Sequence, residues 1–120
     1  MKTNDILQLD CREEESKKII QKVLKQIKPL SKYSDDEIPL DAIEKAIKIM
    51  CTKYQVKIRN ILQEIWANRK YNLWRCEVMV DGTIYDNLGT VYGITMYEVL
   101  AKVAILIYSE IKKERLKVRK

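Results

Sequence analysis

The stretch 66–75, WANRKYNLWR, holds the residues whose types and spacing best fit a binding chemistry. Its aromatic residues are Trp66, Tyr71 and Trp74, and its cationic residues are Arg69, Lys70 and Arg75. Sites for single-stranded nucleic acid interleave stacking rings with cations in this way. Cation–π pairs inside a protein give the same pattern, so a structural role for the two tryptophans is the competing interpretation. Arg69, Lys70 and Tyr71 fall in a connector, and we expect them to be exposed.

The C-terminal segment 112–120, KKERLKVRK, is the second concentration of positive charge. It has one acidic residue and six basic ones, which are Lys112, Lys113, Arg115, Lys117, Arg119 and Lys120. The segment carries +5 of the net charge of +6, which leaves +1 for the other 111 residues. Such a tail binds nucleic acid, binds an acidic protein or simply aids solubility.

All three glycines, Gly82, Gly89 and Gly93, lie within residues 80–95. A phosphate-binding Walker loop needs G-x-x-x-x-G-K-[ST], but Gly93 is followed by Ile94 and Thr95. The spacing also differs from the G-x-G-x-x-G of dinucleotide sites. We therefore predict that the glycines turn the chain at positions of positive φ. The remaining ligand option is a weak anion site at the helix that follows Gly93.

The composition argues against an enzyme. There is no histidine, which removes the usual general base and the commonest metal ligand. Cys11, Cys51 and Cys76 have no C-x-x-C spacing, so no zinc site is expected. The acidic run 35–37 is interpreted as capping the next helix rather than as a catalytic or metal cluster. No cofactor is predicted, although a two-carboxylate hydrolase is not excluded by sequence.

Two N-terminal helices are predicted, over residues 12–28 and 41–54, because apolar residues recur on one face of each. Asp10 with Glu13, and Asp41 with Glu44, have the spacing of a capping box. The next segment is ambiguous. Ile58, Ile61 and Ile65 have helical spacing and favour a helix over about 56–67, while alternation over 54–60 supports a strand as the alternative.

From residue 73 the period changes to two, which predicts a small antiparallel meander over about 73–92. A strand over 73–80 puts Cys76 and Val78 on the apolar side. The Asp81-Gly82 pair predicts a hairpin, and 83–88 is the returning strand. Residues 87–89 allow a second turn, and 90–92 form a short third strand that ends at Gly93.

The last helix begins at Thr95, which forms a capping box with Glu98. It is apolar on almost every side, so it must be buried on more than one face. We predict that part of this surface forms a homodimer interface. The proposed interface residues are Tyr97, Leu100, Ala104, Ile107, Tyr108 and Ile111. The alternative is that the N-terminal helices cover this surface.

The stretch from Cys76 to Ala104 resembles the C-terminal half of a double-stranded RNA-binding domain in its strand, turn, strand, turn and helix. In that family the last helix opens with a Lys-Lys-x-Ala-Lys type of run that contacts phosphates. The corresponding residues 95–102 contain Lys102 as their one cation and Glu98 as an acid. The resemblance therefore implies a similar topology without the phosphate contacts, and we assign the chain to no family.

Together these features predict a single α+β domain over residues 1–120, with N-terminal helices, a small meander and a long C-terminal helix packed on it. The odd cysteine number and the lack of a secretory or membrane-spanning pattern favour the cytoplasm. The function expected is that of a small non-enzymatic binding protein. It would be a phage or mobile-element accessory protein that modulates or inhibits a larger host complex, as anti-CRISPR inhibitors do. The alternative is a nucleic-acid-binding protein that uses the basic tail and the connector 66–75.

Overall fold

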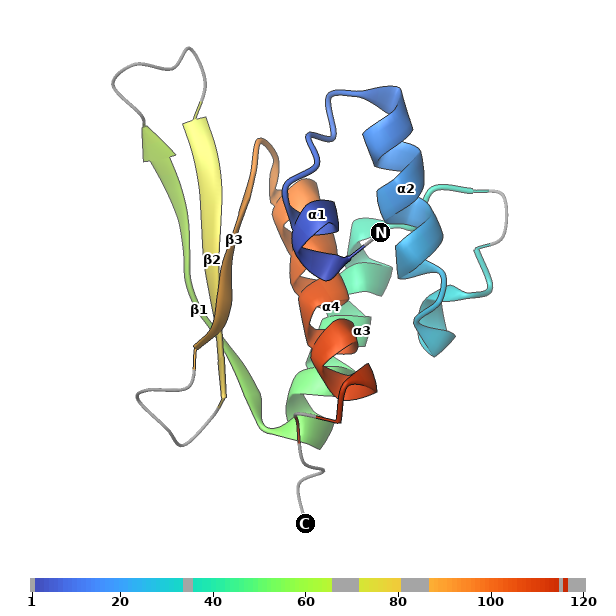
Figure 1. Cartoon of the computed structure of the whole chain (residues 1–120), viewed down its shortest axis with the longest axis vertical. Helices are drawn as coiled ribbons and strands as arrows, with labels where there is room; N and C mark the ends of the chain where they lie inside the picture. Colours follow the sequence, from blue (N-terminus) through green and yellow to red (C-terminus); the bar gives the residue numbers. More distant parts are fainter. Residues whose placement is uncertain (1, 34–35, 66–71, 81–86, 115, 117–120) are drawn as a thin grey trace.

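A computed structural model describes residues 2–33, 36–65, 72–80, 87–114 and 116. The chain forms two layers, a three-stranded antiparallel sheet and a set of helices that cover one face of it (Figure 1). The helical elements are α1 (Thr3–Leu7), α2 (Glu14–Leu24), η1 (Lys28–Leu30), α3 (Leu40–Tyr54) and α4 (Met96–Lys112). The predicted α+β class is confirmed, and α1 is an element that the sequence pattern did not predict.

The sheet has the order β1-β2-β3, with β1 at Val56–Ile65, β2 at Asn72–Val80 and β3 at Asn87–Gly93. The helix favoured over 56–67 is therefore wrong, and the alternative strand was nearer. The register between β1 and β2 shifts between Arg59 and Leu62. Such a bulge breaks the two-residue alternation, which is why the apolar residues of β1 imitate helical spacing.

The predicted strand over 73–80 is confirmed as β2, but β3 differs from expectation. Residues 87–93 form one continuous strand rather than a turn at 87–89 followed by a short strand. The pairing of β3 with β2 has a register shift, because Val78 pairs with Gly89 and Met79 pairs with Asn87. Leu88 is therefore the additional residue of β3. The predicted Asp81-Gly82 hairpin and most of the returning strand lie outside the described residues.

Gly89 and Gly93 are required for different reasons. Gly89 has φ +154°, a backbone conformation that L side chains rarely adopt. Gly93 does not have a positive φ, so that part of the prediction is wrong. It must be glycine because a Cβ there would lie 2.6 Å from Oε2 of Glu98. Close approach of a side chain, rather than a turn, explains this second glycine.

The two predicted capping boxes at the N-terminal helices are absent. The Asp10 carboxylate instead accepts hydrogen bonds from the backbone and the guanidinium of Arg12, and this lowers its pKa. Consequently α2 begins only at Glu14, without a side-chain cap. The other helix, α3, follows Pro39 and also lacks a side-chain cap. Its predicted range is nevertheless confirmed to within one residue at its start.

The central element is α4, whose residues 98–107 are all buried. It contacts α1, α2, α3, β2 and β3. The predicted cap is confirmed, because Oγ1 of Thr95 accepts a hydrogen bond from the Glu98 backbone N–H at 3.1 Å. Within the described ranges, no helix is both long and apolar enough to cross a membrane.

Candidate functional site

A cleft of about 470 Å³ lies between β3 and the N-terminal arm, which we define as residues 4–10. The β3 wall includes Leu88, Gly89, Thr90 and Tyr92, and the arm contributes Leu7 and Leu9 among others. Leu106 and Lys102 of α4 also line the cleft. Because β3 ends the strand order, it is an edge strand within the described sheet. The cleft therefore joins a sheet edge to a mixed lining, in which the leucines lie beside the polar residues Asn4, Gln8 and Asp10.

Glu98 and Lys102 form a buried ion pair beside this cleft. Their side chains are only 3% and 5% exposed, and Lys102 Nζ lies 3.9 Å from Glu98 Oε2. The Glu98 carboxylate accepts backbone hydrogen bonds of 2.6 Å from Cys11 and from Ile94. Lys102 donates to the carbonyl oxygen of Tyr92 at 3.0 Å. Both charges thus bind backbone groups and hold the connector before α2 and the end of β3 against α4.

The start of α4 was considered above as a weak anion site. Helix N-termini attract negative charge, and here the Glu98 carboxylate of the protein itself occupies the position, bonded to the Ile94 N–H. Residues 96 and 97 at the same place are Met and Tyr. Lys102, the one cation of residues 95–102, is engaged with the Glu98 carboxylate and the Tyr92 carbonyl.

The edge of β3 presents backbone groups to the cleft. Lys102 reaches the Tyr92 carbonyl from α4 on the cleft side, so we infer that this carbonyl points away from β2. Backbone groups alternate in direction along a strand, so those of Thr90 point the same way. Within the described part of the chain, no residue outside the sheet bonds the backbone of Thr90.

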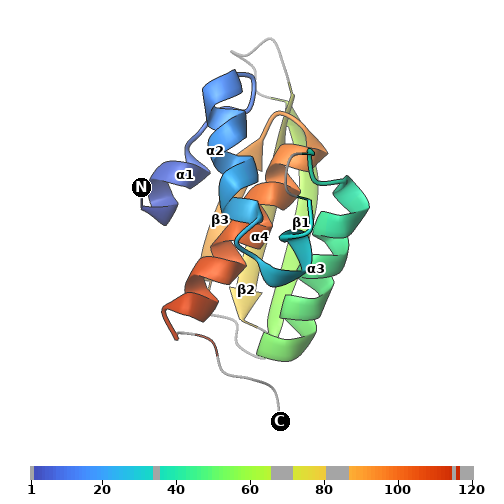
Figure 2. The same cartoon turned by 90° about the vertical axis from the view of Figure 1, so that its right-hand side faces the viewer.

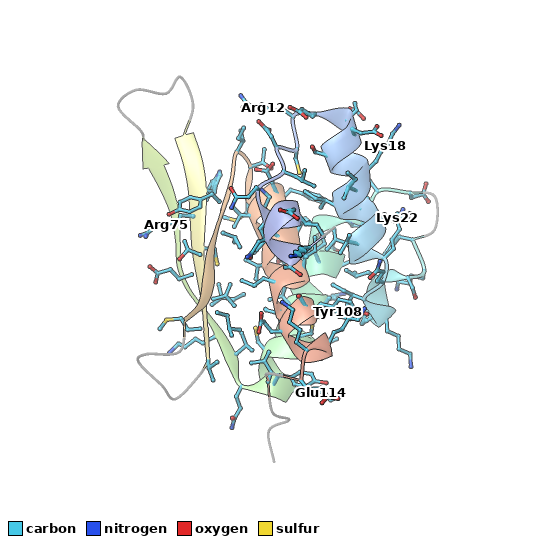
Figure 3. All side chains as sticks on the ribbon, viewed as in Figure 1. Arg12, Lys18, Lys22, Arg75, Tyr108 and Glu114 are labelled. Atoms are coloured by element: carbon cyan, nitrogen blue, oxygen red, sulfur yellow. The ribbon has the colours of Figure 1, made fainter. Side chains whose placement is uncertain are left out.

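The residues predicted for nucleic-acid binding are only partly described. Seven of them lie outside the described residues. These are Arg69, Lys70 and Tyr71 of the connector and Arg115, Lys117, Arg119 and Lys120 of the tail. Arg75 is on β2 and points away from the helical layer (Figure 3), with its guanidinium 3.5 Å from the Glu77 carboxylate. The structure does not bring it together with the exposed Lys112 and Lys113 at the end of α4.

Described lysines do gather at one end of the molecule, which we call the basic end. It consists of Lys53 at the end of α3, Lys57 in β1, and Lys112 and Lys113 at the end of α4, all of them exposed. The helices α3 and α4 pack side by side, and both finish at this end (Figures 1 and 2). Lys113 lies 4.0 Å from Glu110, so its charge is partly balanced.

The proposed dimer residues are largely covered within one chain. Leu100, Ala104 and Ile107 are buried in the core. The Tyr97 hydroxyl accepts a hydrogen bond from Gln21 at 2.7 Å and donates one to the Ile38 carbonyl. Tyr108 and Ile111 are half-buried. The α4 surface that suggested a homodimer is therefore mostly occupied by elements of the same chain.

The three cysteines are free thiols, and their surroundings disfavour thiolate chemistry. Burial raises the pKa of Cys11 to about 12, with the Glu98 carboxylate adding to the effect. Burial also raises the pKa of Cys51 to about 11 and that of Cys76 to about 12. Over the described ranges, no group of three or more acidic or cysteine side chains could hold a metal ion.

Comparison with protein-family models, with curated proteins and with solved structures finds no match for this chain. The chemistry of the cleft is therefore inferred from its own residues. Sequence reasoning found Glu98 through its spacing from Thr95, but it missed Lys102, Leu7 and Leu9 as members of one site. The only local signal for Lys102 was its position four residues after Glu98, which places both on one face of a helix.

Proposed function

We propose that this chain is a non-enzymatic protein-binding module. The observation that carries the proposal is the cleft beside the edge strand β3, which offers apolar side chains and strand backbone to a partner. Three ionisable side chains line the cleft. Glu98 and Lys102 are engaged with backbone groups, and Asp10 is paired with Arg12. These contacts give the cleft a defined shape.

The biological setting that we propose is that of an accessory protein of a phage or mobile element, which modulates or inhibits a larger host complex. Its support is the combination of a chain of 120 residues, without histidine, and a cleft that fits a segment of another protein. Small modules of this kind act by occupying a surface of a larger protein, which needs shape and hydrogen bonding rather than catalysis.

Affinity purification tests this function. The tagged full-length chain is recovered from its native cells after nuclease treatment and a high-salt wash, and co-purifying proteins are quantified. A discrete protein in near-stoichiometric amount is the expected result. Recovery of nucleic acid alone before nuclease treatment, with no protein retained afterwards, would contradict the proposal. The Thr90→Pro variant, which alters the β3 edge, provides the matched comparison.

Nucleic-acid binding is the second candidate, and the basic end is the observation that favours it. Four exposed lysines lie there, at the root of a tail rich in arginine and lysine. With residues 56–65 forming a strand after α3, the resemblance to a double-stranded RNA-binding domain in element order extends from α3 to α4. The positive charge, however, lies at the end of α4 rather than at its start.

A salt series on fluorescent RNA and DNA tests this candidate. Deleting residues 112–120 would be misleading, because Leu116 is buried. Instead, serine replaces the four lysines of the basic end, which are Lys53, Lys57, Lys112 and Lys113. If these lysines bind phosphates of duplex DNA, the slope of log K against log salt should fall by about 0.9 for each lysine–phosphate pair that the substitutions remove. Replacing Lys18 and Lys22 of α2, whose side chains lie in the helical layer away from the sheet (Figure 3), serves as control. Equal slopes in all proteins would exclude the basic end.

A further inference from the structure

We propose that the cleft binds an extended segment of a partner protein, which adds to the sheet as a fourth strand beside β3. This inference rests on the proposed function, because it names how a protein partner would be held. Edge strands present unpaired N–H and C=O groups that pair readily with another chain. Extended peptides use such edges for affinity and side-chain pockets for specificity.

The backbone groups for this pairing are those of Thr90 and Tyr92. The Lys102 bond indicates that the backbone of Tyr92 faces the cleft. The backbone of Thr90, two residues earlier in the same strand, faces the same way. Thr90 offers an N–H and a C=O, and Tyr92 offers an N–H. Lys102 already engages the Tyr92 carbonyl, so the added strand pairs chiefly on the Thr90 side. Toward the start of β3, the register shift at Leu88 interrupts the edge and sets a limit to the pairing.

The side-chain lining indicates what the segment looks like. Successive residues of a strand point to opposite faces, so alternate residues of the added strand would meet the side of the cleft formed by Leu7, Leu9 and Leu106. The other residues would lie beside Tyr92, which is 40% exposed. We therefore expect a segment with an apolar residue at every second position.

A single strand fits this site better than a second copy of the chain does. The whole of β3 spans only seven residues, so an edge-to-edge contact between two copies would bury roughly 230 Å² on each, from a length of about 23 Å and a thickness of about 10 Å. Stable interfaces need about 1,000 Å² or more in total. In Figure 2, α1 lies outermost on the β3 side of the molecule, where the arms of two copies would meet. The volume of about 470 Å³ lies within the range of ordinary ligand-binding pockets.

The probe for this inference is a displayed library of random twelve-residue peptides selected on the folded chain. The strongest binder is then tested against Thr90→Pro and Thr90→Val. Proline removes the N–H that would bond the peptide but is tolerated on edge strands, whereas valine keeps the N–H and favours strands. We expect at least tenfold weaker binding to Thr90→Pro and less than threefold change for Thr90→Val.

Amide hydrogen exchange on the unaltered chain tests the same inference without the Thr90→Pro variant, which could fail to fold. In the unaltered chain, the peptide should slow amide exchange of Thr90 and Tyr92 and leave Val56 to Ile58 of β1 unchanged. A peptide that binds but slows amide exchange at residues other than Thr90 and Tyr92 would overturn the inference. It would leave the proposed protein-binding function standing. Failure to select any binding peptide would also overturn the inference. If affinity purification from native cells still recovered a protein partner, the proposed function would hold, with the partner bound at another surface.

Discussion

Glu98 is the residue on which the N-terminal and C-terminal parts of the chain meet. Its carboxylate receives N–H groups from Cys11, 87 positions earlier, and from Ile94. It also lies against Lys102 and excludes any side chain at position 93. A buried carboxylate without partners is strongly unfavourable. The three contacts together explain why an ionised group is tolerated in this core.

Replacing Glu98 with glutamine should destabilise the fold. The amide cannot accept both backbone N–H groups through two oxygens, and Lys102 loses its counter-ion while still buried. Breaking a buried pair from one side costs about 3 kcal/mol or more. Urea unfolding followed by circular dichroism measures the change. The double variant Glu98→Gln with Lys102→Met should recover part of the loss, and a single variant within about 0.5 kcal/mol of the parent would refute this account.

The cysteines should alkylate slowly. Because the thiolate is the reactive form, a raised pKa means little reaction near neutral pH. Burial raises the pKa to about 11 for Cys51 and to about 12 for Cys11 and Cys76. Rates should rise about tenfold for each pH unit between pH 8 and 10. Peptide mapping after iodoacetamide treatment measures this, with the guanidinium-unfolded chain as control. Rapid labelling of the folded chain at pH 8 would contradict the buried environment.

At the scale of elements, local pattern sufficed where a helix or strand was regular. The ranges of α3, β2 and α4 follow from apolar periodicity and from the Thr95 cap. It failed at β1, where a bulge changes the period and a strand follows α3 with no glycine between them. That helix ends on Gln55 in the left-handed conformation with φ 57°. Glycine usually marks such an end, so the sequence carried no stop signal between α3 and β1.

Tyr97 connects three elements, and its removal gives the prediction for this scale. Its hydroxyl joins Gln21 of α2 and the Ile38 carbonyl before α3 to the start of α4. Burial raises the pKa of this hydroxyl, so it remains protonated at neutral pH. Tyr97→Phe should lower the free energy of unfolding by about 1–2 kcal/mol, because two partners lose a hydrogen bond.

The matched control for this prediction is Tyr108→Phe on the same helix. The Tyr108 ring lies 5.5 Å from Lys112 Nζ, a contact that phenylalanine keeps. Its effect should stay within about 0.5 kcal/mol. Thermal unfolding of both variants measures the difference. If the two substitutions cost the same, the Tyr97 hydroxyl would not be what joins these elements.

For the molecule as a whole, α4 is the helix that other elements of the same chain cover on several sides. The sequence showed that this helix must be covered on several sides, but not which elements cover it. That depends on contacts between α4 and α1, α2 and α3, which are remote in sequence. The cleft was unpredictable for the same reason, because Leu7 and Leu106 line one cavity only in the folded chain. The alternative that N-terminal helices cover α4 agrees with the burial of Leu100, Ala104 and Ile107.

We therefore expect a single chain in solution. Light scattering coupled to size-exclusion chromatography, over a wide range of protein concentration, should give the mass of one chain throughout. A mass of two chains that persists on dilution would show that a second copy binds on a surface other than the buried side of α4. Repeating the run with Thr90→Pro would then tell whether the β3 edge forms that contact.

The position of α4 also has a consequence for biosynthesis. Every other described element leaves the ribosome before α4, the helix that contacts α1, α2, α3, β2 and β3. Until residues 98–107 emerge, the sheet and the earlier helices lack the surface that buries them, and Cys11 lacks its bond to Glu98. Exposed apolar surface of this kind makes nascent chains prone to aggregate. The chain should thus complete its fold only after α4 has been synthesised.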